Sequence, residues 1–336
     1  MALDRRSLIA SGLALGVAGR AGGAAQAGVP PPVLPSAFAA DPHEVIPLWP
    51  QGAPGMPASV PQEVVTQRST DPAYSDRFML GITAPHLAVF RPKHPNGASV
   101  LITPGGGYRW VVVDKEGYEM ARWFAARGVT AFVLFYRLPG DGWGAGPDVV
   151  LQDTQRAMRL IRARAGAYHI DPARVAAMGF SAGGHACADL ATRFSAPVYA
   201  PVDAADRLSA RPFLAAPIYP VISMAAPFAH AGSREKLIGA GAGPELEAAH
   251  SPHLHVPADA PMHFLLHAED DPTVPVENTV MLRAALKAKQ VPLEMHLFAQ
   301  GGHGFGLRLA AGKPVAVWPE LFLSWAKTQG WFYTTS

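Results

Sequence analysis

The residue best suited to chemistry in this chain is a serine between two glycines. Segment 179–183 reads Gly-Phe-Ser-Ala-Gly, with Ser181 at its centre. An apolar run at 174–178 leads into it, and a helical run of small residues at 182–193 leads out. A turn from a strand into a helix exposes such a serine at the strand tip, and a Cβ on the flanking residues would collide there. The five letters alone also fit an ordinary turn, but the strand and the helix around them favour a nucleophile.

A serine hydroxyl is a poor nucleophile unless a base takes its proton and later returns it to the leaving group. His303 is the best candidate for this base. It lies in the glycine-rich segment 301–306, shortly after the last expected strand, 293–298. The backbone there is free to aim the imidazole at Ser181.

The other histidines suggest less reactive roles. His185 lies one helical turn after Ser181, so we expect a polar neighbour on that helix. His267 lies inside the apolar run 262–268, and we expect a core histidine. The histidine spacings within 250–255 fit no standard zinc pattern, so we expect no metal there.

The imidazole needs an acid that holds its tautomer and stabilises the imidazolium. Three adjacent acids, Glu269, Asp270 and Asp271, directly follow the strand-like run 262–268. The residues alone leave the choice among them open, and the trio also fits a solvated loop. Their place between Ser181 and His303 gives the order serine, acid, histidine, which differs from that of chymotrypsin and subtilisin.

Attack on an acyl group creates an oxyanion, which backbone N–H groups can stabilise. Three consecutive glycines follow the apolar run 99–103, and glycine lets the backbone approach a substrate closely. We predict an oxyanion hole formed by the N–H groups of Gly106, Gly107 and Ala182. The glycines also fit a flexible turn, but their place on the same sheet edge as Ser181 favours the donors.

Three aromatic residues near these loops are candidates for binding the acyl or sugar part of a substrate: Tyr108, Trp110 and Trp143. Ordinary aromatic packing is the alternative. Cys187 lies inside the helix after Ser181, and we expect it to pack there because a catalytic thiol needs an exposed, electropositive site.

Strand-like and helix-like runs alternate from residue 87 to the end. The expected strands are 87–90, 99–103, 129–135, 174–178, 213–219, 262–268 and 293–298, and the expected helices are 116–127, 147–165, 182–193, 277–290 and 315–329. This alternation predicts an α/β fold with a mostly parallel central sheet and helices on both faces. Ligands bind such sheets at the carboxyl ends of the strands, where every loop discussed above begins.

Two stretches fall outside this alternation. Residues 46–85 are rich in prolines and turns, and we expect irregular structure there. Residues 223–261 lack a strand pattern, and we expect a small cap.

The first 27 residues are typical of an export signal. Arg5 and Arg6 precede a weakly apolar run at 8–17, and Ala-Gln-Ala at 25–27 offers a cleavage site. The arginine pair indicates the twin-arginine route, although Leu8 stands where phenylalanine is usual. We therefore expect a periplasmic or secreted protein.

Residues 28–45 are rich in proline and alanine and predict a linker, followed by a single domain at 46–336. The apolar run of the signal is too short to span a bilayer, so we expect no stable membrane anchor.

Composition excludes some classes of partner. The chain has 336 residues, of which 49% are hydrophobic, enough to bury a large core. Its net charge is +2, and the scattered lysines and arginines form no basic stripe, which argues against nucleic acid. The single cysteine allows no intrachain disulfide.

From about residue 46 to the end, the chain resembles α/β-hydrolase serine esterases of the acetyl-xylan-esterase-like group. The matching stretches are Pro104-Gly105-Gly106-Gly107-Tyr108, Lys115-Glu116-Gly117-Tyr118, Gly179-Phe180-Ser181-Ala182-Gly183-Gly184-His185, Asp270-Asp271-Pro272-Thr273-Val274-Pro275 and Gly301-Gly302-His303-Gly304-Phe305. Pro104 departs from the lipase-like relatives, which carry histidine before the glycines.

This resemblance implies the α/β-hydrolase fold and Asp271 as the acid that partners His303 and Ser181. It implies no metal and no cofactor. It also implies hydrolysis of short acyl esters, often acetyl groups on plant cell-wall polysaccharides, so the expected partner is a small ester or an acetylated oligo- or polysaccharide.

Two other functions fit the same pattern. Prolyl oligopeptidases share the fold and the order of the triad, but they usually carry a propeller domain for which this length leaves no room. An exported carbohydrate-binding or scaffold protein would keep the fold without activity. The complete set of triad and oxyanion-hole candidates argues against a carbohydrate-binding or scaffold protein without activity.

Overall fold

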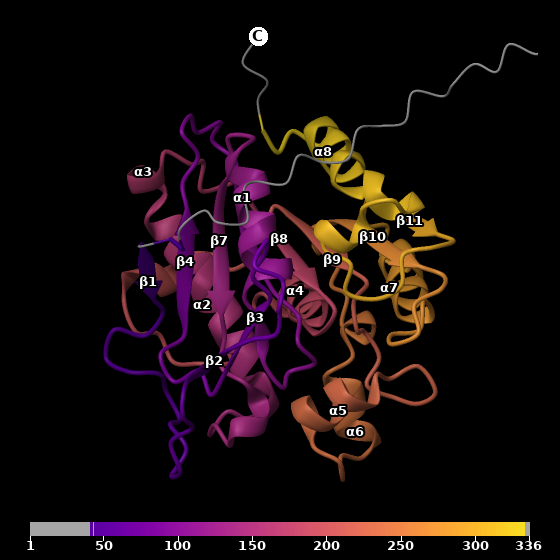
Figure 1. Cartoon of the computed structure of the whole chain (residues 1–336). Coiled ribbons are helices and arrows are strands. Elements are labelled where there is room, and N and C mark those ends of the chain that lie inside the picture. The colour runs from indigo at the N-terminus through magenta and orange to yellow at the C-terminus, as the bar shows by residue number, and fades with distance from the viewer. Residues whose placement is uncertain (1–40, 43, 333–336) are drawn as a thin grey trace, which may run out of the picture. The chain divides into compact units, whose positions relative to one another are not determined.

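An eight-stranded sheet forms the centre of the computed structural model, which describes residues 41, 42 and 44–332 (Figure 1). In sheet order the strands are β1 (Val45–Pro47), β4 (His86–Phe90), β7 (Thr130–Phe135), β5 (Ser99–Thr103), β8 (Val175–Phe180), β9 (Leu214–Ile218), β10 (Met262–Ala268) and β11 (Leu293–Phe298). The predicted export signal and most of the predicted linker lie outside the described residues.

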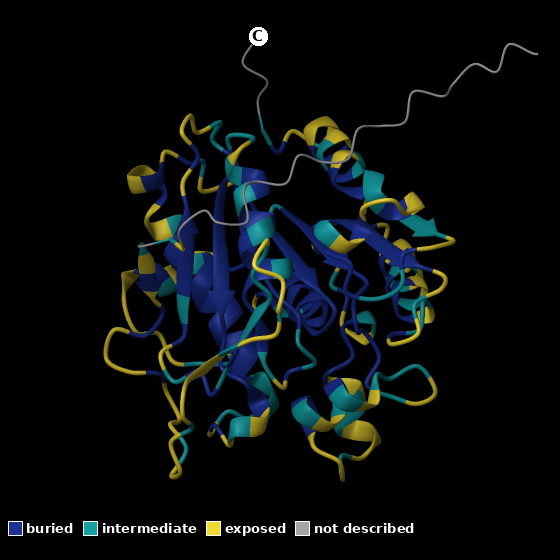
Figure 2. Cartoon of the chain, viewed as in Figure 1, coloured by how far each residue is buried: buried dark blue, intermediate teal, exposed yellow. Residues whose placement is uncertain are grey.

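Most of this sheet is parallel, as the sequence predicts. Strands β7, β5, β8, β9, β10 and β11 run parallel, whereas β1 and β4 pair antiparallel at one edge. Figure 2 shows the central strands buried throughout, which is typical of a parallel sheet covered by helices on both faces. Continuous apolar runs form these strands because neither of their faces meets water.

Eight α-helices are seen in the described part of the chain: α1 (Glu119–Ala125), α2 (Val149–Ala163), α3 (Ala165–Tyr168), α4 (Ala182–Arg193), α5 (Ala231–Ile238), α6 (Pro244–Ala249), α7 (Glu277–Ala288) and α8 (Trp318–Thr328). Helix α2 packs on α4, and α1 contacts α8 through Phe124 and Phe322, whose ring centroids lie 6.0 Å apart. None of the helices in the described residues is long and apolar enough to cross a membrane.

Short helical turns occupy several connections. A π-helical turn, η1 (Asp114–Tyr118), runs directly into α1. The 3-10 turns are η2 (Pro139–Asp141), η3 (Gly146–Asp148), η4 (Ala204–Arg207), η5 (Pro252–Leu254), η6 (Arg308–Ala310) and η7 (Pro314–Val317). The predicted helix at 116–127 is therefore two joined pieces.

The expectation of irregular structure at 46–85 holds for most of the region but is wrong at three short strands. Besides β1 in the main sheet, this region supplies β2 (Val64–Gln67) and β3 (Arg77–Leu80), which form a small antiparallel sheet with β6 (Val111–Val112). These strands are only two to four residues long. Strands this short leave no periodic pattern to read, and β1 ends in a proline, which is tolerated because β1 is an edge strand.

Residues 223–261 contain α5, α6 and η5 and no strand. Figure 1 shows α5 and α6 side by side at the bottom of the view, with α8 at the top. Helix α5 begins after His230, whose Nδ1 accepts a hydrogen bond from the Ser233 N–H at 3.2 Å. This capping interaction fixes His230 at the start of the segment.

A buried ion pair joins the loop after β7 to helix α2, and the N-terminal segment is hydrogen-bonded to both of its members. The Arg137 and Asp153 side chains have no exposed surface, and Arg137 Nη2 lies 2.7 Å from Asp153 Oδ1. The same oxygen accepts a hydrogen bond from Trp49 Nε1 at 2.8 Å, and Arg137 Nη1 donates to the Pro54 carbonyl at 2.7 Å. The segment around β1 is therefore held by charged hydrogen bonds as well as by packing.

We expect Asp153→Ala to lower the free energy of unfolding by about 3–5 kcal/mol, because it leaves the buried Arg137 guanidinium unpaired. Equilibrium urea unfolding would measure the loss. The exposed pair of Glu320 with Arg127, at 3.0 Å, provides the control, and Glu320→Ala should cost less than about 1 kcal/mol. Equal losses in the two variants would contradict the role of burial.

His263 gives folding a predictable pH dependence. It is fully buried in β10, and burial lowers the pKa of its imidazole from 6.5 to about 4. Between these values the unfolded chain binds a proton that the folded chain does not, so stability falls as the pH is lowered through this window. His263→Leu should reduce that fall by on the order of 2 kcal/mol. Denaturant titrations at about pH 7 and about pH 4.5 would check this, and an unchanged pH dependence in the variant would refute it.

Candidate active site

Ser181 sits on a sharp turn between β8 and α4. Its backbone has φ 54° and ψ −120°, a conformation that residues with a side chain rarely adopt. A Cβ on Gly179 would lie 2.0 Å from the Gly183 carbonyl oxygen, and one on Gly183 would lie 2.0 Å from the Thr103 carbonyl oxygen. Both glycines are therefore required, and the turn has the strand-to-helix geometry that the sequence predicts.

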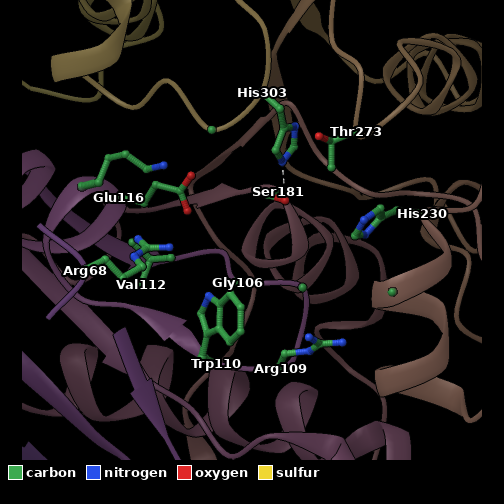
Figure 3. Close-up of a pocket in the computed structure, with 14 residues that line it drawn as sticks. Arg68, Gly106, Arg109, Trp110, Val112, Glu116, Ser181, His230, Thr273 and His303 are labelled. Carbon is green, nitrogen blue, oxygen red and sulfur yellow. Dashed lines mark hydrogen bonds between the residues drawn. The ribbon is translucent and has the colours of Figure 1, made fainter. Parts of the chain in front are cut away.

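His303 links Ser181 to an acid, and Figure 3 shows its hydrogen bond to the serine. Its Nε2 lies 2.8 Å from Ser181 Oγ, and its Nδ1 lies 2.7 Å from Asp271 Oδ2. Because the ionised carboxylate only accepts hydrogen bonds, Nδ1 carries the proton and Nε2 is left free to accept the serine proton. The structure thus brings the three predicted triad residues into one hydrogen-bonded chain.

The Asp271 side chain is buried and receives four donors. Oδ1 accepts the N–H groups of Thr273 and Val274 at 2.8 and 2.9 Å, and Oδ2 also lies 3.2 Å from His267 Nε2. Burial opposes ionisation of this carboxyl, but the hydrogen bonds from His267 and His303 outweigh it and hold its pKa well below the usual value. His267, expected only as a core histidine, is therefore a second imidazole on the acid, a contact that its place in an apolar run did not indicate.

The two neighbouring acids, Asp270 and Glu269, do not contact the His303 imidazole. Asp270 Oδ1 accepts the N–H groups of Gly301 and Gly302 at 2.8 and 2.7 Å, and these hydrogen bonds lower the pKa of the exposed carboxyl. Asp270 therefore holds the loop that carries His303, and Glu269 is exposed. Of the three acids, Asp271 is the one that contacts the imidazole.

The loop after β5 places Gly106 and Gly107 beside Ser181 on the wall of the same cavity. The Gly105 N–H already donates to Glu116 Oε2 at 2.8 Å. Gly106 has φ 133°, and a Cβ on it would lie 2.1 Å from the Trp110 carbonyl oxygen, so only glycine fits.

The third predicted donor belongs to helix α4. Ala182 is the first residue of that helix, so its N–H has no partner within the helix. The positive end of the helix dipole also favours negative charge at this point.

Glu116 connects the two loops on either side of the serine. It is buried, and its Oε1 accepts the Tyr219 hydroxyl proton at 3.0 Å, while Oε2 holds Gly105. The Tyr219 oxygen in turn accepts the Gly306 N–H at 3.1 Å, and the Tyr219 ring centroid lies 5.1 Å from that of His303. Glu116 and Tyr219 carried no predicted role. Tyr219 lies 103 residues from Glu116 and 87 residues from Gly306, so the sequence does not show that they meet.

The cavity in front of Ser181 has a volume of about 440 Å³. Side chains that line it include Arg68, Arg109, Trp110, Lys115, His230 and Thr273. Of the three aromatic residues predicted to bind substrate, only Trp110 is among the lining residues. Its ring rests against Phe78 of β3, with ring centroids 4.8 Å apart.

Tyr108 and Trp143 do not line this cavity, so the prediction for these two is corrected. Tyr108 has φ 58°, which turns its side chain inward, and it is 1% exposed. Trp143 is also buried, with the Arg137 guanidinium 4.9 Å from its ring centroid. Both aromatic residues pack in the interior beneath the loops.

His185 lies buried next to Tyr108 of the glycine loop after β5. Its Nε2 donates to the His250 carbonyl oxygen at 2.8 Å, so its Nδ1 accepts the Tyr108 hydroxyl proton at 2.6 Å. Burial lowers the pKa of His185 to about 4, which keeps the ring neutral at neutral pH. His185 therefore anchors Tyr108 and does not contact Ser181 as a base.

No group of three or more His, Cys, Asp or Glu side chains in the described residues is arranged to hold a metal ion. Cys187 is fully buried inside α4, where burial raises the pKa of its thiol to about 12. A thiol in this state is not a nucleophile.

Two family models match the chain. The one described as BD-FAE matches residues 87–210, which include Ser181 and the glycine loop. The one described as the prolyl oligopeptidase family matches residues 215–327, which include Asp271 and His303.

Curated proteins similar to this chain are longer than it. Endo-1,4-beta-xylanase B of Butyrivibrio fibrisolvens is 36% identical over 210 residues, which are 61% of this chain and 32% of that protein. Acetylxylan esterase of Xylanibacter ruminicola is 30% identical over 225 residues, which are 66% of this chain and 43% of that protein. The chain thus spans less than half the length of these two relatives.

Solved structures match over most of the chain. The carboxylesterase Cest-2923 from Lactobacillus plantarum is 23% identical with a TM-score of 0.62, covers 82% of this chain and all of that one (100%), and shows the fold alone. An acetyl ester-xyloside bifunctional hydrolase from Caldicellulosiruptor lactoaceticus is 33% identical with a TM-score of 0.71, and the match covers 88% of this chain and 100% of that one. Because this second match extends over the whole relative, the chain belongs to the α/β-hydrolase esterases.

Proposed function

We propose that this protein is a serine carboxylic-ester hydrolase that works through an acyl-enzyme and removes acetyl groups from acetylated carbohydrates. The observation that carries the proposal is the hydrogen-bonded chain from Ser181 through His303 to Asp271, facing a cavity beside Gly106 and Gly107. The acetylxylan esterase and the acetyl ester-xyloside hydrolase among the relatives support the acetyl and carbohydrate parts.

In the first half of the reaction, His303 Nε2 takes the proton as Ser181 Oγ attacks the ester carbonyl carbon. The carbonyl oxygen becomes an oxyanion and receives the N–H groups of Gly106, Gly107 and Ala182. His303 then returns the proton to the leaving alcohol, and the acyl group stays on the serine.

In the second half, His303 takes a proton from water, and the water oxygen attacks the acyl carbon. The bond from that carbon to Ser181 Oγ then breaks, His303 returns the proton to Oγ, and the acid is released. The imidazolium that forms in each half lies against Asp271, whose carboxylate stays ionised because its pKa is held low by its donors. Asp271 therefore stabilises the imidazolium without itself accepting the proton.

We also propose that the protein is exported by the twin-arginine route to the periplasm or beyond. The support is the sequence of residues 1–27, with Arg5, Arg6 and the Ala-Gln-Ala at 25–27. Cell fractionation of the full chain would test this, and purely cytoplasmic protein would refute it.

A peptidase of the prolyl oligopeptidase type is the second candidate, because that family model matches residues 215–327. The matched stretch carries the acid and the histidine, which esterases and peptidases can share. Turnover of proline-amide substrates at a rate similar to that of acetyl esters would favour the peptidase. Acetate release from acetylated xylan, pectin and small sugar acetates would favour the esterase.

We expect Ser181→Ala to lower kcat on p-nitrophenyl acetate by about 10⁴-fold or more, because it removes the nucleophile. A fluorophosphonate should add to the unmodified protein and not to the variant, as intact mass would show. Cys187→Ala is the matched control, since it removes a buried thiol of α4 that does not contact Ser181, and its activity should be unchanged. A Ser181→Ala protein with most of its activity would refute the assignment.

We expect Asp271→Asn to lower kcat by about 10⁴-fold, because an amide does not hold the catalytic tautomer or stabilise the imidazolium. Asp270→Asn should cost only about tenfold, since its remaining oxygen still accepts the N–H groups of the histidine loop. Steady-state kinetics of the two variants, measured side by side, would decide. A larger loss from Asp270→Asn would make Asp270 the functional acid.

A further inference from the structure

The cavity in front of Ser181 carries more positive than negative charge. Three basic side chains line it, Arg68, Arg109 and Lys115, against one acid, Glu116. The Glu116 carboxyl is committed on both oxygens, to Gly105 and to Tyr219, as described above. A small cavity with such a surplus of cations favours an anionic ligand.

The three cations differ in how far they are already neutralised. Arg68 Nη2 lies 2.8 Å from Asp76 Oδ1, so its charge is paired. Lys115 Nζ lies 3.2 Å from the position of a Cβ on Gly304, so this cation lies beside the loop that carries His303.

Arg109 and Lys115 both line the cavity, and neither forms an ion pair within the described residues. Arg109 lies with its charged group 5.7 Å from the ring centroid of Trp110. Its backbone N–H donates to the Gly106 carbonyl oxygen at 3.1 Å, which makes Arg109 part of the same turn as the predicted oxyanion donors. The Arg109 side chain therefore extends from the same turn as the N–H groups predicted to bind the oxyanion of the substrate.

Trp110 supplies a neighbouring apolar surface. Its ring is half-buried and supported from behind by Phe78, and Figure 3 shows it with Arg109 on the side of the cavity opposite His303. An aromatic face beside an arginine suits a sugar ring that bears a carboxylate, because the ring packs on the indole while the guanidinium takes the carboxylate in a two-point hydrogen bond.

We propose that the cavity accepts an acetylated sugar that carries a carboxylate, a uronic acid derivative, with that carboxylate paired to Arg109 and the sugar ring against Trp110. This inference rests on the proposed esterase function and adds the charge of its substrate. A neutral acetylated sugar would be hydrolysed as well, but less efficiently.

The test compares two substrates that differ only in charge: a peracetylated methyl glucuronide with a free carboxylate and its primary amide. Acetate release by the purified protein near neutral pH should give a kcat/KM about three- to tenfold higher for the carboxylate. The preference should shrink as salt is raised, because screening weakens a partly exposed ion pair.

Arg109→Gln should bring the ratio of the two kcat/KM values close to one, while the value for the amide changes by less than about twofold. Arg109→Lys should keep part of the preference, because it keeps the charge and loses the two-point geometry. Lys289→Gln, which removes an exposed cation outside the cavity, is the matched control and should leave the ratio unchanged.

The outcomes separate this inference from the proposed function. If p-nitrophenyl acetate and both sugar acetates are left intact, the esterase function itself is overturned. If both sugar acetates are hydrolysed with a ratio near one, or Arg109→Gln lowers both values equally, the esterase stands and the anionic substrate is overturned.

Discussion

The close approach of two neighbouring strand ends controls the geometry of this site. The sharp turn between β8 and α4, which carries Ser181, lies close to the end of β5. A Cβ on Gly183 would lie 2.0 Å from the Thr103 carbonyl oxygen. A Cβ on Gly105 would lie 3.0 Å from the Cβ of Ser181. Because no side chain fits between them, the N–H groups that follow Gly105 lie beside the nucleophile before any substrate binds. The parallel pairing of the two strands, with Thr103 opposite Gly179, holds this approach in register.

The buried carboxyl of Glu116 links the glycine loop after β5 to the loop that carries His303. Glu116 holds the Gly105 N–H on one oxygen and the Tyr219 hydroxyl on the other, and Tyr219 holds the Gly306 N–H. Buried polar groups whose hydrogen bonds are all satisfied make a structure rigid, and here they link the loops of the predicted donors and of the predicted base. The distance from His303 to the donors therefore depends on a shared network and not on each glycine-rich loop alone.

Much of the fold could be predicted because it rests on local patterns. The runs that became β10 and β11 and the helix α4 were expected at their observed bounds, since long apolar runs and helical spacing report burial directly. Strands β1, β2 and β3 were missed because two to four residues carry no periodicity, and they exist only where a neighbouring strand supplies the hydrogen bonds.

The sequence by itself determined the order of the elements and which loops carry Ser181, Asp271 and His303, because a glycine-flanked turn after an apolar run has one place in a parallel sheet. Which acid reaches the imidazole follows from the folded arrangement of the loop, since adjacent carboxylates differ only in the direction of their side chains. Only the tertiary structure decided that Trp110 lines the cavity while other aromatic residues pack inside, and that Arg109 meets no carboxylate there. These outcomes depend on contacts between segments far apart in the chain, and no local pattern records such contacts.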